Sequence, residues 1–487
     1  MSDSSQCHIL VLGMELILIE GIYRRIAKKS NHKFSHLAHP MYTPQDWPSD
    51  LSKENIHFFR HVADQKMPDP DRVLLASLER DGVPTIHNMI QSDRIVSKLG
   101  YDEALRYSTF LVRRMIEAFT EIEPTIVIGA YDGIHGSLCL AVCRYLDIPW
   151  FCLHFSVIPT GLACFCDKLT PSARVNLANN ISRDEHVAQA DNSLLMFEKR
   201  EIQAPAYVAP RPLSIVGVLR NLPKRFGSLV STFRRGRRRE SLIYTEEAAN
   251  YSISAALIYF WCVSKARRAL SKTKILSEPP ADRFVFFGLH MQPESSVDVW
   301  APFYSNQIWV IELLARSIPP SHKLLIKIHK SDAANYSRKQ LDHIASLPGV
   351  EIVDPFADAQ NFIRQADLIV SIQGTIGLEG ALYGKPVIML GDSPNIVFDS
   401  VSCIGNIVEL PALVRRKMNR SVIDRAQIIK AYAKFMAPFM PASSNIWSER
   451  KTDKEIDRYV ELFDKLSAYV DTDKDPVRST NKRKSYV

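Results

Sequence analysis

Residues 368–390 contain a pattern that could bind the phosphate of a nucleotide. An apolar run that ends at Ile372 precedes the segment Gln373-Gly374-Thr375, a helical pattern follows from Leu378, and a second apolar run begins at Val387. This order predicts a strand, a glycine turn, a short helix and a second strand, which together are one unit of a parallel α/β sheet. Because a helix N-terminus leaves backbone N–H groups free and carries the positive end of the helix dipole, we expect it to bind an anion.

Glu379 is the second candidate in this segment. It lies about one turn into the predicted helix, where a carboxylate that accepts from two vicinal hydroxyls would hold a ribose through strong, directional contacts. Two structural interpretations stay open beside this one. Gly374 and Gly377 could serve a tight turn alone, and Glu379 could be a solvated residue near the favourable end of the helix dipole.

Further polar residues follow the apolar runs 284–287 and 324–328. They are His290, Gln292, Glu294, His329 and Lys330. Because ligands of doubly wound sheets bind beyond the carboxyl ends of the strands, we expect these residues to meet the glycine turn at one crevice. There, the N–H groups of the turn, with His329 and Lys330, would stabilise negative charge on a phosphate. Gln292 would orient the molecule that carries the phosphate.

Two of these residues also have a plain structural interpretation. Glu294 would act as a general acid or base, or it would anchor its own loop, because the preceding Pro293 predicts a rigid turn. A histidine after a strand, such as His329, serves a structural contact about as often as it binds a phosphate.

A catalytic base is expected in the N-terminal half of the chain. Asp132 and His135 lie in a glycine-containing loop after the apolar run 126–128, and such loops face the ligand side of an α/β sheet. Glu15, which follows the first predicted strand, is the reserve candidate. Asp132 could instead cap the helix that follows it, because Asp is a preferred N-cap residue.

We expect neither a metal ion nor a cofactor. Asp69-Pro70-Asp71 and Asp471-Thr472-Asp473 fit an Asp-x-Asp pattern that holds divalent cations in some enzymes, but neither follows a sheet strand. The first is a proline turn and the second lies in a polar tail, so both are more simply solvated turns. No His and Cys residues have the spacing of zinc ligands.

The composition is that of a globular chain with more than one core. Its 487 residues are 46% hydrophobic and 23% charged, which predicts two or three domains. No apolar stretch reaches the roughly 18–20 residues that a membrane span requires. The polar N-terminus lacks a basic signal-peptide region. The eight cysteines show no Cys-x-x-Cys pair, so free thiols in a reducing cytosol, and a cytoplasmic location, are expected.

The net charge of +8 is concentrated between residues 220 and 239. This segment contains apolar residues among its cations, which include Arg234, Arg235, Arg237, Arg238 and Arg239. Such a pattern predicts peripheral contact with an anionic membrane surface, where each cation contributes about 1 kcal/mol. A solvated loop is an equal alternative. A nucleic-acid contact is not expected, since aromatic stacking platforms are missing.

The chain divides by pattern into two α/β halves. We expect strands at 8–12, 126–128, 150–154, 284–287, 324–328, 350–353, 368–372 and 387–390, and helices at 16–29, 101–121, 137–146 and 422–439. The expected divisions are an N-terminal Rossmann-like domain at 1–204, a proline-rich, basic and helical connecting region at 205–280, a C-terminal Rossmann-like domain at 281–421, return helices at 422–470 and a disordered polar tail at 471–487.

Two Rossmann-like halves with a phosphate-type turn in the second resemble the GT-B glycosyltransferase architecture, in which two domains face each other across a cleft and a C-terminal helix crosses back to the first. More specifically, the C-terminal half resembles the bacterial capsule polysaccharide biosynthesis family, which includes Kdo (3-deoxy-manno-octulosonate) transferases. Four stretches carry the resemblance, in the family's order: residues 288–295, residues 302–304 with Gln307, residues 325–329, and residues 374–391. The N-terminal half resembles the family in general organisation.

This resemblance implies a metal-independent glycosyltransferase that moves a sugar from a nucleotide-activated donor, such as CMP-Kdo, to a growing surface polysaccharide or a lipid-linked glycan. The nucleotide-sugar would be a co-substrate. One departure bears on the donor: the family usually has a His-Pro pair where this chain has His329-Lys330. The retained histidine keeps the phosphate contact, whereas the loss of proline alters the loop.

Two alternative functions stay open. A nucleotide-sugar 2-epimerase shares the double α/β architecture and a glycine turn with a downstream glutamate, and it would use a nucleotide-sugar without any acceptor. A catalytically inactive scaffold of polysaccharide assembly would bind the nucleotide without turnover, and the altered His329-Lys330 turn is its best support.

Overall fold

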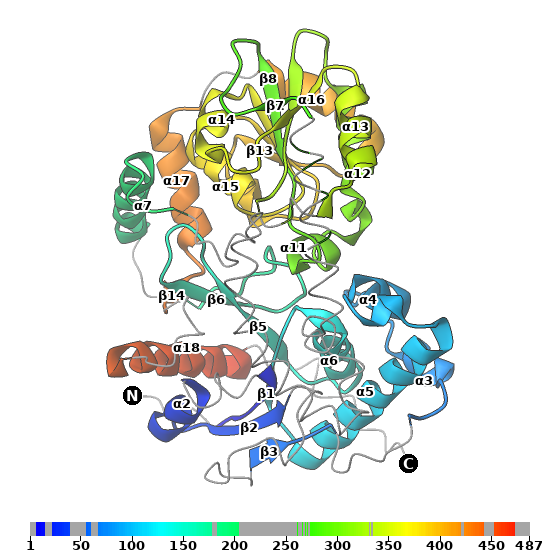
Figure 1. The fold of residues 1–487 in the computed structure, drawn as a ribbon. Coiled ribbons are helices and arrows are strands. Elements are labelled where there is room, and N and C mark those ends of the chain that lie inside the picture. Colours follow the sequence, from blue (N-terminus) through cyan, green and yellow to red (C-terminus); the bar gives the residue numbers. More distant parts are fainter. Residues whose placement is uncertain are drawn as a thin grey trace.

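The computed structural model describes most of the chain as two α/β domains (Figure 1). The described residues are 6–14, 22–38, 55–59, 67–177, 183–203, 261, 265, 268, 270, 273–330, 332, 335–419, 423–442 and 452–472. The predicted reserve base Glu15, the arginines of residues 220–239, nearly all of the predicted connecting region 205–280 before residue 273, and residues 473–487 of the predicted tail lie outside the described residues.

The first domain contains a seven-stranded sheet. Its strands are β1 (His8–Met14), β2 (Lys33–Ala38), β3 (Ile56–His57), β4 (Ile126–Gly129), β5 (Trp150–Phe155), β6 (Leu162–Cys166) and β14 (Met440–Pro441), in the order β14-β6-β5-β4-β1-β2-β3. Strands β1 to β5 pair in parallel, while β6 and β14 extend the edge in antiparallel fashion. Because the order reverses between β1 and β4, loops that follow these two strands are placed at a ligand-binding edge.

Helices cover both faces of this sheet. The elements between β3 and β5 are α3 (Arg72–Ser77), α4 (Ile86–Ser92), η4 (Val96–Lys98), α5 (Tyr101–Ile122) and α6 (Gly133–Tyr145). Buried Leu111, Met115 and Phe119 of α5 pack with α6 on one face. On the other face lie α2 (Arg24–Lys29) and α18 (Asp453–Thr472), whose Tyr459 and Phe463 are buried. The apolar periodicity that predicted α5 is therefore the surface by which it packs.

The second domain contains a fully parallel sheet. Its strands are β7 (Ile275–Leu276), β8 (Phe284–Gly288), β9 (Lys323–Lys327), β10 (Val350–Val353), β11 (Leu368–Ser371), β12 (Val387–Met389) and β13 (Val401–Cys403), in the order β13-β12-β11-β8-β9-β10-β7. Most of their residues are buried on both faces, as the near-continuous apolar runs predict. The order reverses between β8 and β11, so their carboxyl ends flank the expected ligand crevice.

The helices of the second domain form two layers. On one face lie α14 (Ala359–Gln365) and α15 (Thr375–Leu382), and on the other lie α12 (Gln307–Ser317), α13 (Arg338–Ser346) and α16 (Leu410–Met418). The short elements α11 (Ser295–Asp298), η5 (Pro302–Tyr304), η7 (Pro394–Val397) and η8 (Ile407–Glu409) lie in the connections. The predicted fold of two Rossmann-like domains is confirmed.

Within the described residues, the C-terminal part of the chain returns from the second domain to the first (Figure 1). Helix α17 (Arg425–Met436) packs against α7 (Arg183–Glu198), and the chain then enters the first sheet as β14 and covers it with α18. The predicted return of a C-terminal helix is thus confirmed. The prediction placed residues up to 204 in the first domain, but α7 packs with the second, because its buried Ala190, Leu194 and Phe197 join that core.

Gly129 ends β4 directly before the loop that carries Asp132. A β-carbon at this position would lie 2.1 Å from Nε1 of Trp150, a ring that is 1% exposed and has no space into which to turn. The strand and the ring can therefore pack together only when residue 129 has no side chain.

We expect Gly129→Ala to lower the free energy of unfolding by about 1–3 kcal/mol, the usual cost of overpacking a core. Urea denaturation followed by tryptophan fluorescence measures this loss. Gly405→Ala is the matched control, because Gly405 has no atom within 4 Å of an added β-carbon. Equal stability of the two variants would contradict this account of the Gly129–Trp150 contact.

Candidate active site between the domains

The glycine turn after β11 presents the N-terminus of α15. Gly374 caps this helix with φ +82°, in the left-handed region that favours glycine. Gly374 is exposed, and Thr375 and Ile376 are half-buried. Because the first backbone N–H groups of a helix have no intrahelical partner, this end of α15 can bind an anion. The helix begins three residues earlier than the predicted start at Leu378.

A buried histidine lies directly beneath this turn. Nε2 of His290 is 2.6 Å from the carbonyl oxygen of Gln373, to which it donates a hydrogen bond. Burial lowers the pKa of His290 to about 4, so the imidazole is neutral near pH 7. Gln307 holds the backbone of His290 from both sides, through hydrogen bonds of 2.8 and 3.0 Å. His290 therefore supports the turn from below, and a direct donor contact of His290 stays a prediction.

The side-chain amides of Gln292 and Gln373 also form hydrogen bonds within the protein around this turn. Oε1 of Gln292 accepts from Gln307 at 2.8 Å, and its Nε2 donates to Asp298 at 3.0 Å. Nε2 of Gln373 donates to the backbone oxygen of Asp392. In this structure both amides fix the two loops that flank the turn. Their predicted contacts with a bound donor stay predictions.

Glu379 is enclosed on the inner side of α15. Its side chain is 8% exposed, so the alternative of a solvated helix residue is wrong. Burial raises the pKa of Glu379 to about 7; a hydrogen bond with Thr375 opposes this rise, and the negative charge of Asp358 adds to it. Glu379 is thus a buried carboxyl group that changes its charge near neutral pH, one helical turn from the phosphate-type turn.

Lys327 ends β9, and His329 and Lys330 follow it. Burial lowers the pKa of half-buried His329, and the charges of Lys327 and Lys330 lower it further. His329 in turn lowers the pKa of His290, which places the two imidazoles close to each other. Nζ of Lys327 donates to the backbone oxygens of Pro355, at 2.6 Å, and Asp354. The carboxyl end of β9 is therefore positive and adjoins the turn.

Asp132 faces the second domain from the start of α6. It occupies the N-cap position but makes no capping hydrogen bond. Oδ2 of Asp93 accepts from the backbone N–H of Ile134 at 2.8 Å instead, so capping does not explain Asp132. Its Oδ2 accepts from Nη2 of Arg94 at 3.0 Å. His135 lies in the same first turn, beside Gly133.

Glu294 lies across the domain boundary from Asp132. Burial raises the pKa of Glu294; Ser296 and the charge of Arg94 lower it, whereas Asp132 and Asp298 raise it. The ring of Tyr131, next to Asp132 in the chain, meets the ring of Trp300, which follows α11, with centroids 5.2 Å apart. The structure thus brings together Asp132 and Glu294, which come from different domains. Asp298 holds this loop by accepting from the N–H of Glu294 at 2.9 Å, and the anchoring of the loop by the Glu294 side chain stays a prediction.

Three charged residues of this region were not predicted: Asp93, Arg94 and Lys327. Asp93 and Arg94 follow a short helix rather than a strand, so no pattern connects them to the site. Lys327 was hidden inside an apolar strand, where a lone lysine is the one signal that could have identified it.

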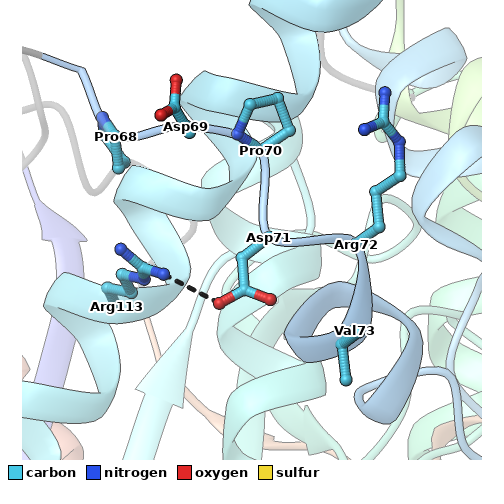
Figure 2. Close-up of a pocket in the computed structure, with 7 residues that line it drawn as sticks. All are labelled: Pro68, Asp69, Pro70, Asp71, Arg72, Val73 and Arg113. Atoms are coloured by element: carbon cyan, nitrogen blue, oxygen red, sulfur yellow. Dashed lines mark hydrogen bonds and ion pairs between the residues drawn. The ribbon is translucent and has the colours of Figure 1, made fainter.

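The first Asp-x-Asp segment lies in a surface hollow of the first domain (Figure 2). Asp69 pairs with Arg106 at 2.5 Å, and Asp71 pairs with Arg113 at 2.8 Å and caps α3 through the N–H of Leu74. Both carboxylates thus hold α3 and α5 together. In the second segment, Asp471 and Thr472 end α18. Across the described ranges, no three His, Cys, Asp or Glu side chains are grouped as metal ligands, and no helix is long and apolar enough to cross a membrane.

Comparison with known families identifies part of the chain. Residues 228–396, about a third of the sequence, match the model of the capsule polysaccharide biosynthesis protein family. The resemblance predicted from the sequence motifs is therefore confirmed for this segment. A search of curated protein sequences gave no match.

Solved structures with a similar arrangement are remote in sequence. The β-Kdo 2,4-transferase domain of Thermosulfurimonas dismutans KpsC is 13% identical, over 75% of this chain and 90% of its own, with a TM-score of 0.33. The UDP-GlcNAc 2-epimerase of Methanocaldococcus jannaschii is 12% identical, over 88% and 97%, with a TM-score of 0.26. Staphylococcus aureus MnaA, solved with UDP, is 10% identical, over 89% and 94%, with a TM-score of 0.29. Likenesses this weak add nothing to what the residues themselves show.

We expect Glu379→Gln to remove a pH dependence of stability. Because the pKa of Glu379 is raised to about 7 in the folded protein, the folded state binds more protons than the unfolded state between about pH 4.5 and 7. Stability from this group is therefore present below pH 4.5 and lost as the pH rises to 7. The quantity to compare is the free energy of unfolding of the variant minus that of the wild type. At about 1.4 kcal/mol per pKa unit, this difference should be up to roughly 3 kcal/mol more favourable to the variant at pH 8 than at pH 4.5.

Urea denaturation at several pH values measures this difference. Glu409→Gln is the control, because Glu409 is exposed at the start of α16. A stability difference for Glu379→Gln that stays flat from pH 4.5 to 8 would contradict the burial of an ionisable carboxyl group at this position.

Proposed function

We propose, from the match of residues 228–396 to the capsule polysaccharide biosynthesis family, that the protein is a glycosyltransferase. It moves a sugar from a nucleotide-activated donor to a growing surface polysaccharide or a lipid-linked glycan. The observation that carries the proposal is the open N-terminus of α15, which begins at Gly374 where the strand order of the second sheet reverses. Such a position is where an α/β sheet receives a phosphate-bearing ligand.

The second domain would bind the donor. The diphosphate or monophosphate lies against the first N–H groups of α15, with His329 and Lys330 beside it. When the bond between the anomeric carbon and the phosphate oxygen breaks, its electron pair stays on that oxygen. The helix N-terminus and Lys330 stabilise the charge that grows there. Glu379 accepts hydrogen bonds from the ribose, a role that requires its ionised form.

The first domain would activate the acceptor. The acceptor hydroxyl gives its proton to the Asp132 carboxylate while its oxygen forms the new bond to the anomeric carbon. His135, in the same turn of α6, is the second candidate for this proton. Glu294, on the second domain, is the candidate acid, since burial favours its protonated form. Its proton would go to the departing phosphate oxygen, which keeps the electron pair of the broken bond.

The donor class follows from the family resemblance, which favours CMP-Kdo. The chain has Lys330 after His329 where the family usually has proline, so a cation would stand beside the phosphate. A cytoplasmic protein held at an anionic membrane by residues 220–239 would meet lipid-linked acceptors there. Metal independence is part of the same proposal, since main-chain donors and Lys330 supply the charge that a cation would otherwise provide.

Thermal-shift measurements with CMP, UDP, GDP, TDP and ADP test the donor site. A nucleotide that binds only the folded state raises the melting temperature by mass action, and we expect one of the five to do so selectively. We expect Glu379→Ala to weaken that nucleotide at least about tenfold, the value of one strong charge-assisted hydrogen bond. Glu409→Ala, on the exposed surface of the same domain, should bind as wild type does.

The outcomes separate the alternatives. A CMP response with release of CMP from CMP-Kdo that depends on an acceptor supports the transferase. A UDP response with sugar epimerisation and no need for an acceptor would make the protein a 2-epimerase. Binding with no turnover of any nucleotide-sugar would make it a scaffold, and the absence of any nucleotide response would refute the donor site at α15.

We expect replacement of Arg234, Arg235, Arg237, Arg238 and Arg239 by glutamine to weaken binding to vesicles that contain anionic lipid, by about 1 kcal/mol per cation at low salt. Sedimentation with vesicles of phosphatidylglycerol and phosphatidylcholine measures this binding. Vesicles of phosphatidylcholine alone are the control. Unchanged sedimentation with the anionic vesicles would refute the membrane contact.

A further inference from the structure

Arg94 is fixed in place by the residue before it. Oδ1 of Asp93 accepts from the N–H groups of Ile95 and Val96 at 2.9 and 2.8 Å, which closes the turn between α4 and η4. Oδ2 of the same carboxylate accepts from Ile134 in α6. One side chain therefore ties the Arg94 turn to the helix that carries Asp132. The ion pair between Arg94 and Asp132, 3.0 Å long, joins two segments that are already held together.

The second domain contacts the first at this point. Trp300 packs on Tyr131 and on His154, with ring centroids 5.2 and 6.0 Å apart. Val299 packs against the core of the first domain. Both residues follow α11 directly, and Glu294 is the N-cap of α11. The end of α11 is thus seated against the loop of Asp132, and the charges of Arg94 and Asp132 both act on Glu294 at the start of this short helix.

Two carboxyl groups in one partly buried place repel each other when both are ionised. Among the described residues, Asp298, His135, Asp93 and His154 are further titratable groups close to this place. Asp298 is engaged with Gln292 and with the N–H of Glu294, Asp93 caps α6, and His135 lies in the first turn of α6. Arg94 is the cation whose charge acts on both Asp132 and Glu294.

We propose that Arg94 is a positioning residue of the interdomain site: it is the shared counter-ion that lets Asp132 and Glu294 face each other across the domain boundary with different roles. This inference rests on the proposed function for its chemistry. Asp132, held by Arg94, is placed to take the acceptor proton. In the second domain, burial and the charge of Asp132 raise the pKa of Glu294 against the opposing charge of Arg94, so Glu294 can act as the acid. Arg94 itself touches no reacting atom.

The turnover test compares Arg94→Met and Arg94→Lys with wild type. We expect Arg94→Met to lower kcat about 100-fold, within the usual range for a misplaced general base, and to leave KM for the donor within about twofold. Arg94→Lys should recover most of the loss, because it restores the cation. Arg106→Met is the matched control, since Arg106 also pairs with an aspartate of the first domain but through Asp69 and α5. It should keep full activity.

A second readout is independent of turnover. Protein labelled with ¹³C at glutamate carboxyl groups reports the titration of Glu294, assigned through Glu294→Gln. Because Arg94 lowers the pKa of Glu294 and Asp132 raises it, Arg94→Met should move this titration to higher pH and Asp132→Asn should move it to lower pH. The double variant should lie between the two single variants.

The outcomes decide the proposal and separate it from the proposed function. Opposite movements of the Glu294 titration support the shared counter-ion, even if the wild type transfers no sugar, in which case the proposed function alone fails. A Glu294 titration that neither variant moves would overturn the proposal, and so would wild-type kcat in Arg94→Met. A loss of activity that Arg94→Lys does not relieve, with a lowered melting temperature, would make Arg94 a structural residue only.

Discussion

The hydrogen bond from the buried imidazole of His290 to the carbonyl of Gln373 is the contact on which the candidate donor site depends. It fixes the peptide before Gly374, and that glycine then takes the left-handed conformation that starts α15 with its N–H groups exposed. The bond is made by a neutral ring, because burial disfavours the charged form. Gln307 holds the same histidine by its backbone, so both the ring and the backbone of His290 contribute hydrogen bonds that fix the turn.

Function in this architecture requires that groups on two domains meet. The second domain carries the turn, Glu379 and the positive end of β9, while the first carries Asp132 and Arg94. Three kinds of contact hold the domains together at this place: Trp300 against Tyr131 and His154, Asp392 accepting from Thr170 and Ser172, and Arg174 stacked on Phe435 and Phe439. The backbone oxygen of Asp392 also accepts from Gln373, the residue before Gly374. Asp392 therefore takes part both in the contact between the domains and in the hydrogen bonds that hold the glycine turn.

The sequence predicted most central parallel strands but not β2, β3, β7 or β13, and it was insufficient for much of the candidate site. Buried strands such as Ile126–Gly129 and Val350–Val353 were predicted to within a residue, because their apolar runs end at clear turns. Strand β6, which pairs with β5, and the edge strand β14 were not predicted. For β14, antiparallel pairing with a segment hundreds of residues away leaves no local period. The site residues after the strands were found by topology. Sequence spacing does not encode three-dimensional contacts. It could therefore not predict that the side chains of Gln292 and Gln373 hydrogen-bond to other parts of the protein, or that Arg94 forms an ion pair with Asp132.

The most direct test of the account is a crystal structure of the protein with the nucleotide that gives the thermal shift. We expect its phosphate within hydrogen-bonding distance of the N–H groups of Thr375 and Ile376, with His329 and Lys330 beside it and the ribose hydroxyls on Glu379. His290 should keep its bond to Gln373 and make no contact with the ligand. A nucleotide bound elsewhere, with the start of α15 facing only solvent, would contradict the assignment of this turn as the donor site.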